Sequence, residues 1–214
     1  MARTDSKTIR VLLVDDHELV RQGLRAVVTA APDMIVVGEA ANAEAALARV
    51  AEVRPDVITL DLTMPGMSGL SAARSLKEAS NAAIVAVTRH AEDAFVQELL
   101  AAGASGYVLK QSPSDALLGA IRTVASGGQY LDPALSHEAR DPRRRPTSAP
   151  VTARELEVLR LTALGHPNKE IATRLNISVK TVEVHKTNAM RKLNLQGRSD
   201  VVRYAVMKEW LRET

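Results

Sequence analysis

The sequence predicts two domains: a doubly wound α/β domain with five parallel strands, and a smaller all-α domain of four helices. Three observations predict this arrangement. Short apolar runs alternate with helical patterns in the first half of the 214 residues. Residues 1–131 carry 12 Lys and Arg against 15 Asp and Glu, whereas residues 132–214 carry 16 against 10. Three prolines interrupt residues 141–150. We therefore place the first domain at 8–130, a linker at 131–149 and the second domain at 150–214.

The strand candidates are short and apolar throughout, which is typical of strands that helices bury on both faces. They lie at residues 11–14, 35–38, 57–60, 84–88 and 106–109. Helical patterns follow them near 17–30, 42–52, 69–79, 91–102 and 114–126. Because a helix follows each strand, the pattern favours a parallel sheet covered by helices.

The second domain carries helix signals only. Thr152 and Glu155 have the spacing of a capping box, and the helix that they start is expected to end near Leu164. The remaining helices are expected over 169–175, 179–193 and 199–211, with caps at Asn168 and Ser178 and with Ser199 starting the last helix.

The composition excludes several classes of site. There is no cysteine, which excludes disulfides, thiolate metal sites and cysteine nucleophiles. The first ten residues are polar, unlike a signal peptide, and no run approaches the roughly 20 apolar residues of a membrane span. We expect a soluble, cytoplasmic protein with no membrane partner. The basic second domain favours a polyanionic partner, and a merely solvated basic face is the alternative.

Polar residues follow four of the predicted strands. Asp15 and Asp16 follow the first strand and Asp61 the third, and in an open parallel sheet such strand ends meet at one edge. Crowded carboxylates need a cation, and Mg²⁺ suits an all-oxygen site. A carboxylate held there can attack phosphorus. Thr88 ends the fourth strand and Lys110 follows the fifth, where a hydroxyl and an ammonium can stabilise phosphoryl oxygens. The alternative for any one of these residues is a helix cap.

Residues 10–128 resemble the receiver domain of response regulators, which has a flavodoxin-like fold. The resemblance rests on Val11-Leu-Leu-Val-Asp-Asp-His17, Leu60-Asp-Leu-Thr-Met-Pro-Gly-Met-Ser-Gly69, Val87-Thr88 and Gly106-Tyr-Val-Leu-Lys110. It implies that Asp61 accepts a phosphoryl group from a sensor histidine kinase. It also implies that Thr88 and Tyr107 form a conformational switch and that Lys110 pairs with the phosphoryl group.

The same resemblance implies a Mg²⁺ site. Asp16 and Asp61 would hold the ion together with the backbone carbonyl of Thr63, and Asp15 would assist without direct contact. His17 is either a further metal ligand or an ordinary residue of the first helical turn, and the second interpretation is favoured. The resemblance also suggests a cis peptide bond at Pro113.

Residues 169–193 have the pattern of a helix-turn-helix, with a scaffold helix, a turn at 176–178 and a recognition helix. Val182, Ala189 and Leu193 share one face of the recognition helix, and basic and hydroxyl residues cover the others. Such a helix can enter a major groove, although an ordinary amphipathic surface helix has the same periodicity.

Residues 150–214 resemble the LuxR-type helix-turn-helix in three segments, 151–157, 168–172 and 181–185. With the receiver, this identifies the chain as a member of the NarL/FixJ family of response regulators. The resemblance places Glu183, Val184 and Thr187 towards base edges, and Lys169, Lys180, Thr181 and Lys186 near phosphates. Glu183 either accepts from cytosine N4 or weakens binding. The last helix is expected to supply a dimer contact.

The expected function is control of transcription through phosphorylation of Asp61, dimerisation and sequence-specific binding to double-stranded DNA. RNA polymerase is a further candidate partner, and no enzyme activity of its own is expected. One alternative is an atypical regulator that dimerises and binds DNA without phosphorylation. Another is an aspartyl-phosphate phosphatase, but such haloacid-dehalogenase-like enzymes carry a second acid where this chain has Thr63. A nucleotide-binding function is disfavoured because the sequence has no Gly-rich phosphate loop. RNA binding through base stacking is disfavoured because the chain has few aromatic residues.

Overall fold

The computed structural model describes residues 8–89, 93–138 and 150–211. The chain divides into two compact units, one built around a sheet and one made of helices. The arginines at 143–145 and the first two residues of the helix predicted at 91–102 lie outside the described residues. Among the helices that are described, none combines the length and apolar character needed to cross a bilayer.

The first unit contains a parallel sheet with strand order β2-β1-β3-β4-β5-β6. The strands are β1 (Ile9–Val14), β2 (Met34–Ala40), β3 (Val57–Leu60), β4 (Ala83–Thr88), β5 (Gly106–Leu109) and β6 (Tyr130–Leu131). The five predicted strands are present, but the predicted count is wrong because β6 extends the edge. This strand has two residues, too few to form an apolar run that the sequence could reveal.

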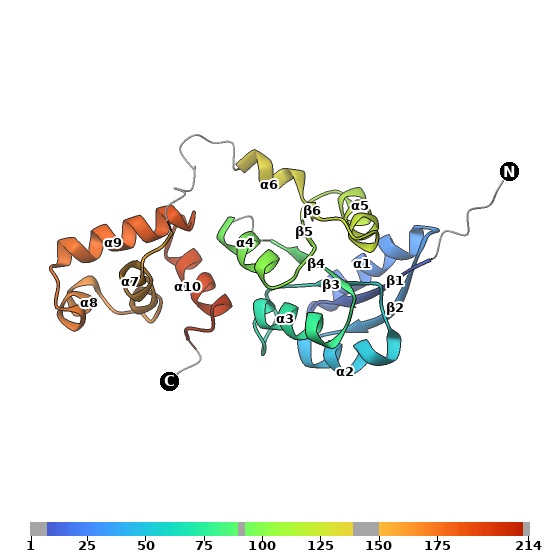
Figure 1. The fold of residues 1–214 in the computed structure, drawn as a ribbon, viewed down its shortest axis with the longest axis horizontal. Coiled ribbons are helices and arrows are strands. Elements are labelled where there is room, and N and C mark those ends of the chain that lie inside the picture. The colour runs from blue at the N-terminus through green and yellow to red at the C-terminus, as the bar shows by residue number, and fades with distance from the viewer. Residues whose placement is uncertain (1–7, 90–92, 139–149, 212–214) are drawn as a thin grey trace. The chain divides into compact units, whose positions relative to one another are not determined.

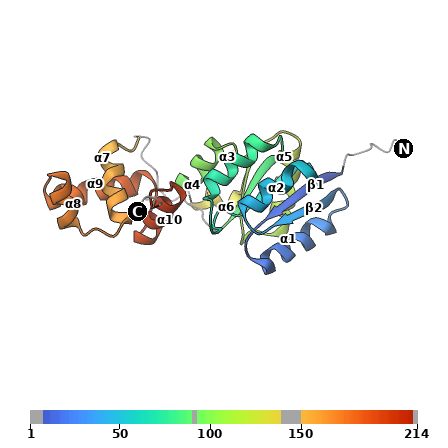
Figure 2. The same cartoon turned by 90° about the horizontal axis from the view of Figure 1, so that it is seen from below.

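Helices cover both faces of the sheet. The helices of this part of the chain are α1 (Glu18–Ala30), α2 (Ala43–Val53), α3 (Gly69–Ala79), α4 (Asp93–Ala101), α5 (Ser114–Ala125) and α6 (Pro133–Glu138). Helices α1 and α5 lie on one side of the sheet and α2 and α3 on the other (Figure 1). The view from below shows the same layers (Figure 2). This is the doubly wound arrangement that the strand–helix alternation predicts.

The core follows the alternation of side chains along the strands. Val11 and Leu13 of β1 join Val85 and Val87 of β4 in a cluster with buried residues of α1 and α5. The intervening Leu12 is also fully buried, on the opposite face. Burial on both faces explains why these strands are apolar at nearly every position.

One expectation for the end of this unit is wrong, and a second, the unstructured start of the linker, needs refinement. The structure has no cis peptide bond among the described residues, so the bond before Pro113 has the trans form that X–Pro bonds prefer by about 0.5–1 kcal/mol. The stretch from residue 131, predicted as linker, begins with regular structure instead. Its helix α6 starts after Asp132, whose carboxylate accepts from the N–H of Ala134 at 2.9 Å. A helix of six residues is too short to show a helical period.

The second unit consists of α7 (Ala153–Ala163), α8 (Asn168–Leu175), α9 (Val179–Lys192) and α10 (Arg198–Met207). The capping box of Thr152 and Glu155 is confirmed at α7. The predicted cap Ser178 is confirmed at α9, where it accepts from the N–H of Thr181. Between α8 and α9, Asn176 adopts a left-handed conformation with φ 51°, which stops α8 and turns the chain.

The predicted starts of the other two helices are each wrong by one residue. Asn168 is the first residue of α8, and Pro167 occupies the cap position. At α10 the cap is Gly197, whose N–H donates to Asp200 Oδ2 at 3.1 Å, so the helix begins at Arg198 and not at Ser199. Helix α10 also ends at Met207, earlier than predicted. Glu209 has φ 59°, and a residue in this conformation cannot continue a right-handed helix.

Candidate functional sites

Three aspartates meet at the carboxyl edge of the sheet. Asp15 and Asp16 follow β1, and Asp61 follows β3, the neighbour of β1. Each carboxylate and the ring of His17 offers one ligand atom, and these atoms lie within 4.8 Å of one another. Asp15 is 0% exposed and Asp61 is 2% exposed. The parallel sheet thus brings together acids that the sequence separates widely.

Lys110 joins two of these aspartates. It follows β5, and its Nζ lies 2.7 Å from Asp15 Oδ2 and 2.8 Å from Asp61 Oδ2. Its side chain is mostly buried as well. Buried carboxylates are costly unless they are paired, so this ammonium compensates part of their charge. Three carboxylates against one ammonium leave this edge negative, which favours a bound cation.

The loop after β3 is held against Asp61. The backbone N–H of Thr63 donates to Asp61 Oδ1 at 3.2 Å, and the Thr63 side chain is exposed. At the start of α3, a Cβ on Gly69 would lie 2.7 Å from the Cα of Leu62. Only glycine fits this close approach, so Gly69 fixes the path of the loop that carries the Thr63 carbonyl.

Thr88 and Tyr107 lie on the two strands beyond β3. Thr88 is the last residue of β4, Tyr107 belongs to β5, and both side chains are fully buried. The backbone N–H of Lys110 donates to the Thr88 carbonyl at 2.7 Å, which ties the ends of these strands together. The hydroxyl residue and the lysine are therefore at the same edge of the sheet as the aspartates.

His17 lies directly before α1 rather than inside its first turn. Its N–H donates to Asp15 Oδ1 at 2.9 Å, and its Nδ1 lies 2.8 Å from Asp16 Oδ1. The ring is 56% exposed and does not cap the helix. The metal-ligand interpretation of His17 therefore stays a prediction, because the ring is within reach of the acids.

Sequence reasoning missed two residues that hold the backbone of this site. Arg21 in α1 donates to the carbonyl of Asp15 at 2.7 Å. Asp132, which is 2% exposed, accepts from the N–H of Leu109 at 3.0 Å, directly before the site lysine. An aspartate followed by proline is a common helix start, so the sequence held a usable signal for Asp132. Nothing in the sequence pattern singled out Arg21.

The second unit presents a basic surface on α8 and α9. Val182 and Ala189 are fully buried and fix the inner side of α9. The predicted DNA contacts are exposed or half-buried: Lys169, Lys180, Thr181, Glu183, Val184, Lys186 and Thr187. In the part of the chain that the structure describes, the three lysines of this set form no ion pair. Their charge is therefore available to a polyanion.

A buried ion pair fixes α9 to the start of α7. Lys192 at the end of α9 donates to Glu155 Oε2 at 2.8 Å and to the Pro150 carbonyl at 3.1 Å. Burial raises the pKa of Glu155, but hydrogen bonds from Lys192 and Thr152 outweigh this and leave the pKa below its usual value. Arg154 also donates to the Leu175 carbonyl at the end of α8. The three helices are thus joined by charged side chains as well as by their apolar core.

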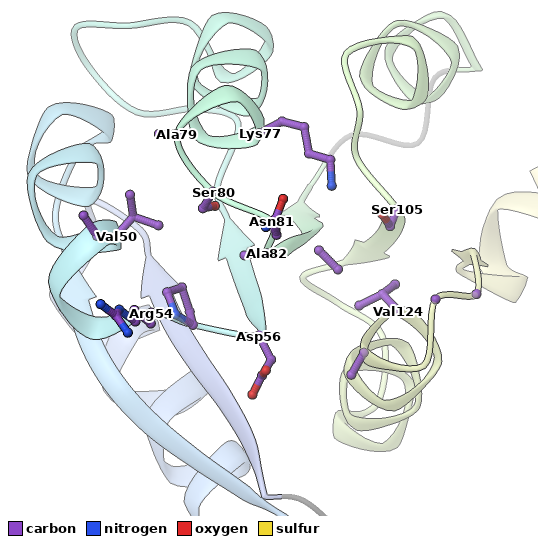
Figure 3. Close-up of a pocket in the computed structure, with 16 residues that line it drawn as sticks. Val50, Arg54, Asp56, Lys77, Ala79, Ser80, Asn81, Ala82, Ser105 and Val124 are labelled. Atoms are coloured by element: carbon purple, nitrogen blue, oxygen red, sulfur yellow. The ribbon is translucent and has the colours of Figure 1, made fainter.

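A cavity of about 760 Å³ lies at the opposite edge of the sheet. Its lining includes Asp56, Ala83 and Ser105, which lie at the amino-terminal ends of β3, β4 and β5. Figure 3 shows Asp56 and Ser105 among the residues that line it. None of the predicted site residues lines this cavity. It is therefore separate from the aspartate cluster.

Comparisons with known proteins agree on both units. Residues 11–122 match the response regulator receiver domain, and residues 149–205 match bacterial regulatory proteins of the luxR family. The chain is 37% identical to the oxygen regulatory protein NreC of Staphylococcus carnosus and 39% identical to NreC of Staphylococcus epidermidis. Each alignment covers 95% of this chain and 99% of the relative.

Solved structures with both domains are also similar. A complex of the response regulator RcsB with DNA matches with a TM-score of 0.82 and 27% identity, covering 94% of this chain and 99% of the other. RcsB from Salmonella enterica serovar Typhimurium, bound to promoter rprA with the phosphomimetic BeF3-, gives a TM-score of 0.81 at the same identity and coverage. The chain therefore belongs to the NarL/FixJ family of two-component response regulators, transcription regulators that combine a receiver domain with a LuxR-type DNA-binding domain.

Proposed function

We propose that Asp61 accepts a phosphoryl group from a sensor histidine kinase, and that this controls homodimerisation and binding to double-stranded DNA. The observation that carries the proposal is the position of Asp61, buried at the strand edge with Lys110 at 2.8 Å. In the reaction, an Asp61 oxygen forms a bond to phosphorus and the bond from phosphorus to the histidine nitrogen of the kinase breaks. The imidazole leaves with the electron pair of that bond.

The neighbouring residues supply what this transfer needs. Lys110 is already paired with Asp61 and can compensate the charge that the phosphoryl oxygens bring. The hydroxyl of Thr88 would donate to one of these oxygens. Tyr107, which is buried in the neighbouring strand β5, would then adjust its position together with Thr88. This change would shift an existing equilibrium towards the dimer.

The donor set fits a Mg²⁺ ion. The cluster is rich in carboxylate oxygens, which this ion prefers. Asp16 is half-buried, and within the described residues only its Oδ1 has a hydrogen-bond partner, the ring of His17, so Asp16 has room for an ion. Asp16, Asp61 and the Thr63 carbonyl would hold the ion, and Asp15 would assist indirectly. When bound, Mg²⁺ would neutralise negative charge around the phosphorus.

The helix pair α8 and α9 is the proposed DNA-binding element. In α9, Glu183, Val184 and Thr187 would contact base edges, as residues of recognition helices do. Lys169, Lys180, Thr181 and Lys186 would contact phosphates. These lysines are exposed or half-buried and form no ion pair among the described residues, which supports this assignment, and RcsB is a similar protein whose solved structure contains DNA.

The proposed domain limits are 8–130 and 150–214, joined by the linker 131–149. The dimer would read paired half-sites, since two-fold symmetry in the protein requires it in the operator. RNA polymerase is a further proposed partner once the dimer is on DNA. The chain would act as a phosphoryl acceptor and regulator rather than as an enzyme on small phosphoesters.

The test is incubation of the full chain with acetyl phosphate and Mg²⁺, followed by intact mass and oligomeric state. We expect the mass of one added phosphoryl group and a shift to dimer. Asp61→Asn should show neither change. Asp56→Asn is the matched control, because Asp56 precedes the same strand at its other end, and it should behave as wild type. Dimerisation and operator binding by Asp61→Asn equal to the phosphorylated wild type would refute the proposal and favour a phosphate-independent regulator.

A further inference from the structure

Glu183 is an isolated acid on the surface of α9. It is exposed, and the described part of the chain gives it no hydrogen-bond or ion-pair partner. Every other acid described between residues 150 and 211 has a partner: Glu155, Glu157, Glu170, Asp200 and Glu209. The carboxylate of Glu183 therefore has no visible task in the fold of this unit.

Its position makes this acid costly for binding to DNA. Lys180 and Lys186 lie three residues before and three residues after it. An acid between them lowers the positive charge that attracts phosphates and so weakens the sequence-independent part of binding. A hydrogen bond between the Glu183 carboxylate and a base donor would offset this repulsion.

We propose that Glu183 is a specificity-determining residue that selects cytosine in the major groove. This inference rests on the proposed DNA binding by α9. Glu183 is the fifth residue of α9, in the N-terminal part from which recognition helices contact base edges. Its neighbour Val184 is 51% exposed and gives the same surface an apolar group suited to a thymine methyl.

The chemistry of the base edges assigns the carboxylate to cytosine. An ionised carboxylate only accepts hydrogen bonds. Cytosine presents the N4 amino donor in the major groove, whereas guanine presents two acceptors and thymine an acceptor and a methyl. Adenine places the N7 acceptor beside its N6 donor, so a carboxylate there gains one bond and meets one repulsion. A wrong base would leave the carboxylate desolvated without a partner, which adds discrimination against it.

The expected discrimination at one base pair is roughly tenfold or more in affinity. The test selects binding sites from random duplex DNA with the full chain, preincubated with acetyl phosphate and Mg²⁺, and sequences the enriched pool. Wild type, Glu183→Gln and Glu183→Lys are compared. Glu157→Gln is the matched control, because it removes the same charge from the exposed Glu157 of α7. Each variant is first checked by circular dichroism to be folded.

We expect one position of each half-site to be cytosine with wild type and with Glu157→Gln. At that position Glu183→Gln should enrich adenine and Glu183→Lys should enrich guanine, following the donors that these side chains present. Identical enriched sequences for wild type and both Glu183 variants, with only a general rise in affinity, would overturn the inference while leaving DNA binding intact. A wild type that enriches no sequence would instead refute both this inference and the proposed function of α9.

Discussion

Replacement of Glu155 by alanine should destabilise the helical unit strongly. The Glu155 carboxylate is 4% exposed. It accepts from Lys192 Nζ at 2.8 Å and from the N–H of Thr152 at 2.8 Å. Alanine removes both contacts and leaves the Lys192 ammonium, whose side chain is 12% exposed, without its carboxylate.

The magnitude follows from these two losses. Breaking a buried ion pair from one side costs about 3–5 kcal/mol, and loss of a helix cap costs about 1 kcal/mol. Lys192 keeps the Pro150 carbonyl as an acceptor at 3.1 Å, which reduces the first cost. We therefore expect the free energy of unfolding to fall by about 3 kcal/mol. If the unpaired ammonium dominates, Glu155→Ala with Lys192→Met should lose only about 1–2 kcal/mol.

The effect should also depend on pH. The pKa of Glu155 lies below its usual value of 4.5, because its hydrogen bonds outweigh burial. A carboxylate with a lowered folded-state pKa stabilises the fold above the unfolded pKa and loses this contribution as the pH falls through the folded pKa. The stability difference between wild type and Glu155→Ala should therefore be complete at neutral pH and narrow below pH 4.5.

Trp210 gives a direct assay, because it is the single tryptophan of the chain and belongs to the helical unit. Urea unfolding followed by its fluorescence, with unchanged dependence on denaturant, reports the free energy of unfolding. A double variant as unstable as Glu155→Ala alone would refute the reasoning, since the cost would then come from lost packing or capping and not from an unpaired ammonium.

Three further predictions concern the other elements. Asp132→Ala leaves the buried N–H of Leu109 without its acceptor and should destabilise the receiver by about 1–3 kcal/mol. Thermal unfolding of the receiver would measure this loss, and Asp132→Asn should lose less stability. Gly69→Ala forces a Cβ to within 2.7 Å of the Leu62 Cα, so we expect slower phosphorylation by acetyl phosphate as the loop after Asp61 shifts, and an unchanged rate would contradict this. Lys180→Ala should lower the slope of log Kd against log salt by about 1 for any DNA sequence, and an unaltered slope in binding titrations would place Lys180 away from phosphates.

The aspartate site was predictable because parallel strands align their carboxyl ends. Asp15, Asp61 and Lys110 lie far apart in sequence, yet each directly follows an apolar run long enough to be recognised as a strand. The register of the sheet then leaves little freedom in where they lie. What could not be predicted was the contact of one Lys110 ammonium with both carboxylates, since this depends on side-chain conformation.

The missed elements lack the periodicity on which sequence interpretation depends. Strand β6 has two residues and helix α6 has six, so neither repeats its period often enough to be detected. Both are stabilised by non-local bonds instead. The N–H of Tyr130 donates to the Ser105 carbonyl, and the N–H of Asp132 donates to the Tyr107 carbonyl at 2.9 Å. Such partners are known only once the sheet is assembled.

Whether an acid on a helix forms an ion pair depends on which residues lie three or four positions away from it, and not only on how many cations the helix contains. In α8, Glu170 has Arg174 four residues later, the spacing at which a glutamate and a following cation interact best, and the pair forms at 2.8 Å. In α9, Thr187 lies four residues after Glu183 and offers no cation, and Lys180 and Lys186 lie three residues away from Glu183. No ion pair forms there among the described residues. A cation four residues later pairs with Glu170. Glu183 has no such cation, so its carboxylate stays available for the proposed contact with a base.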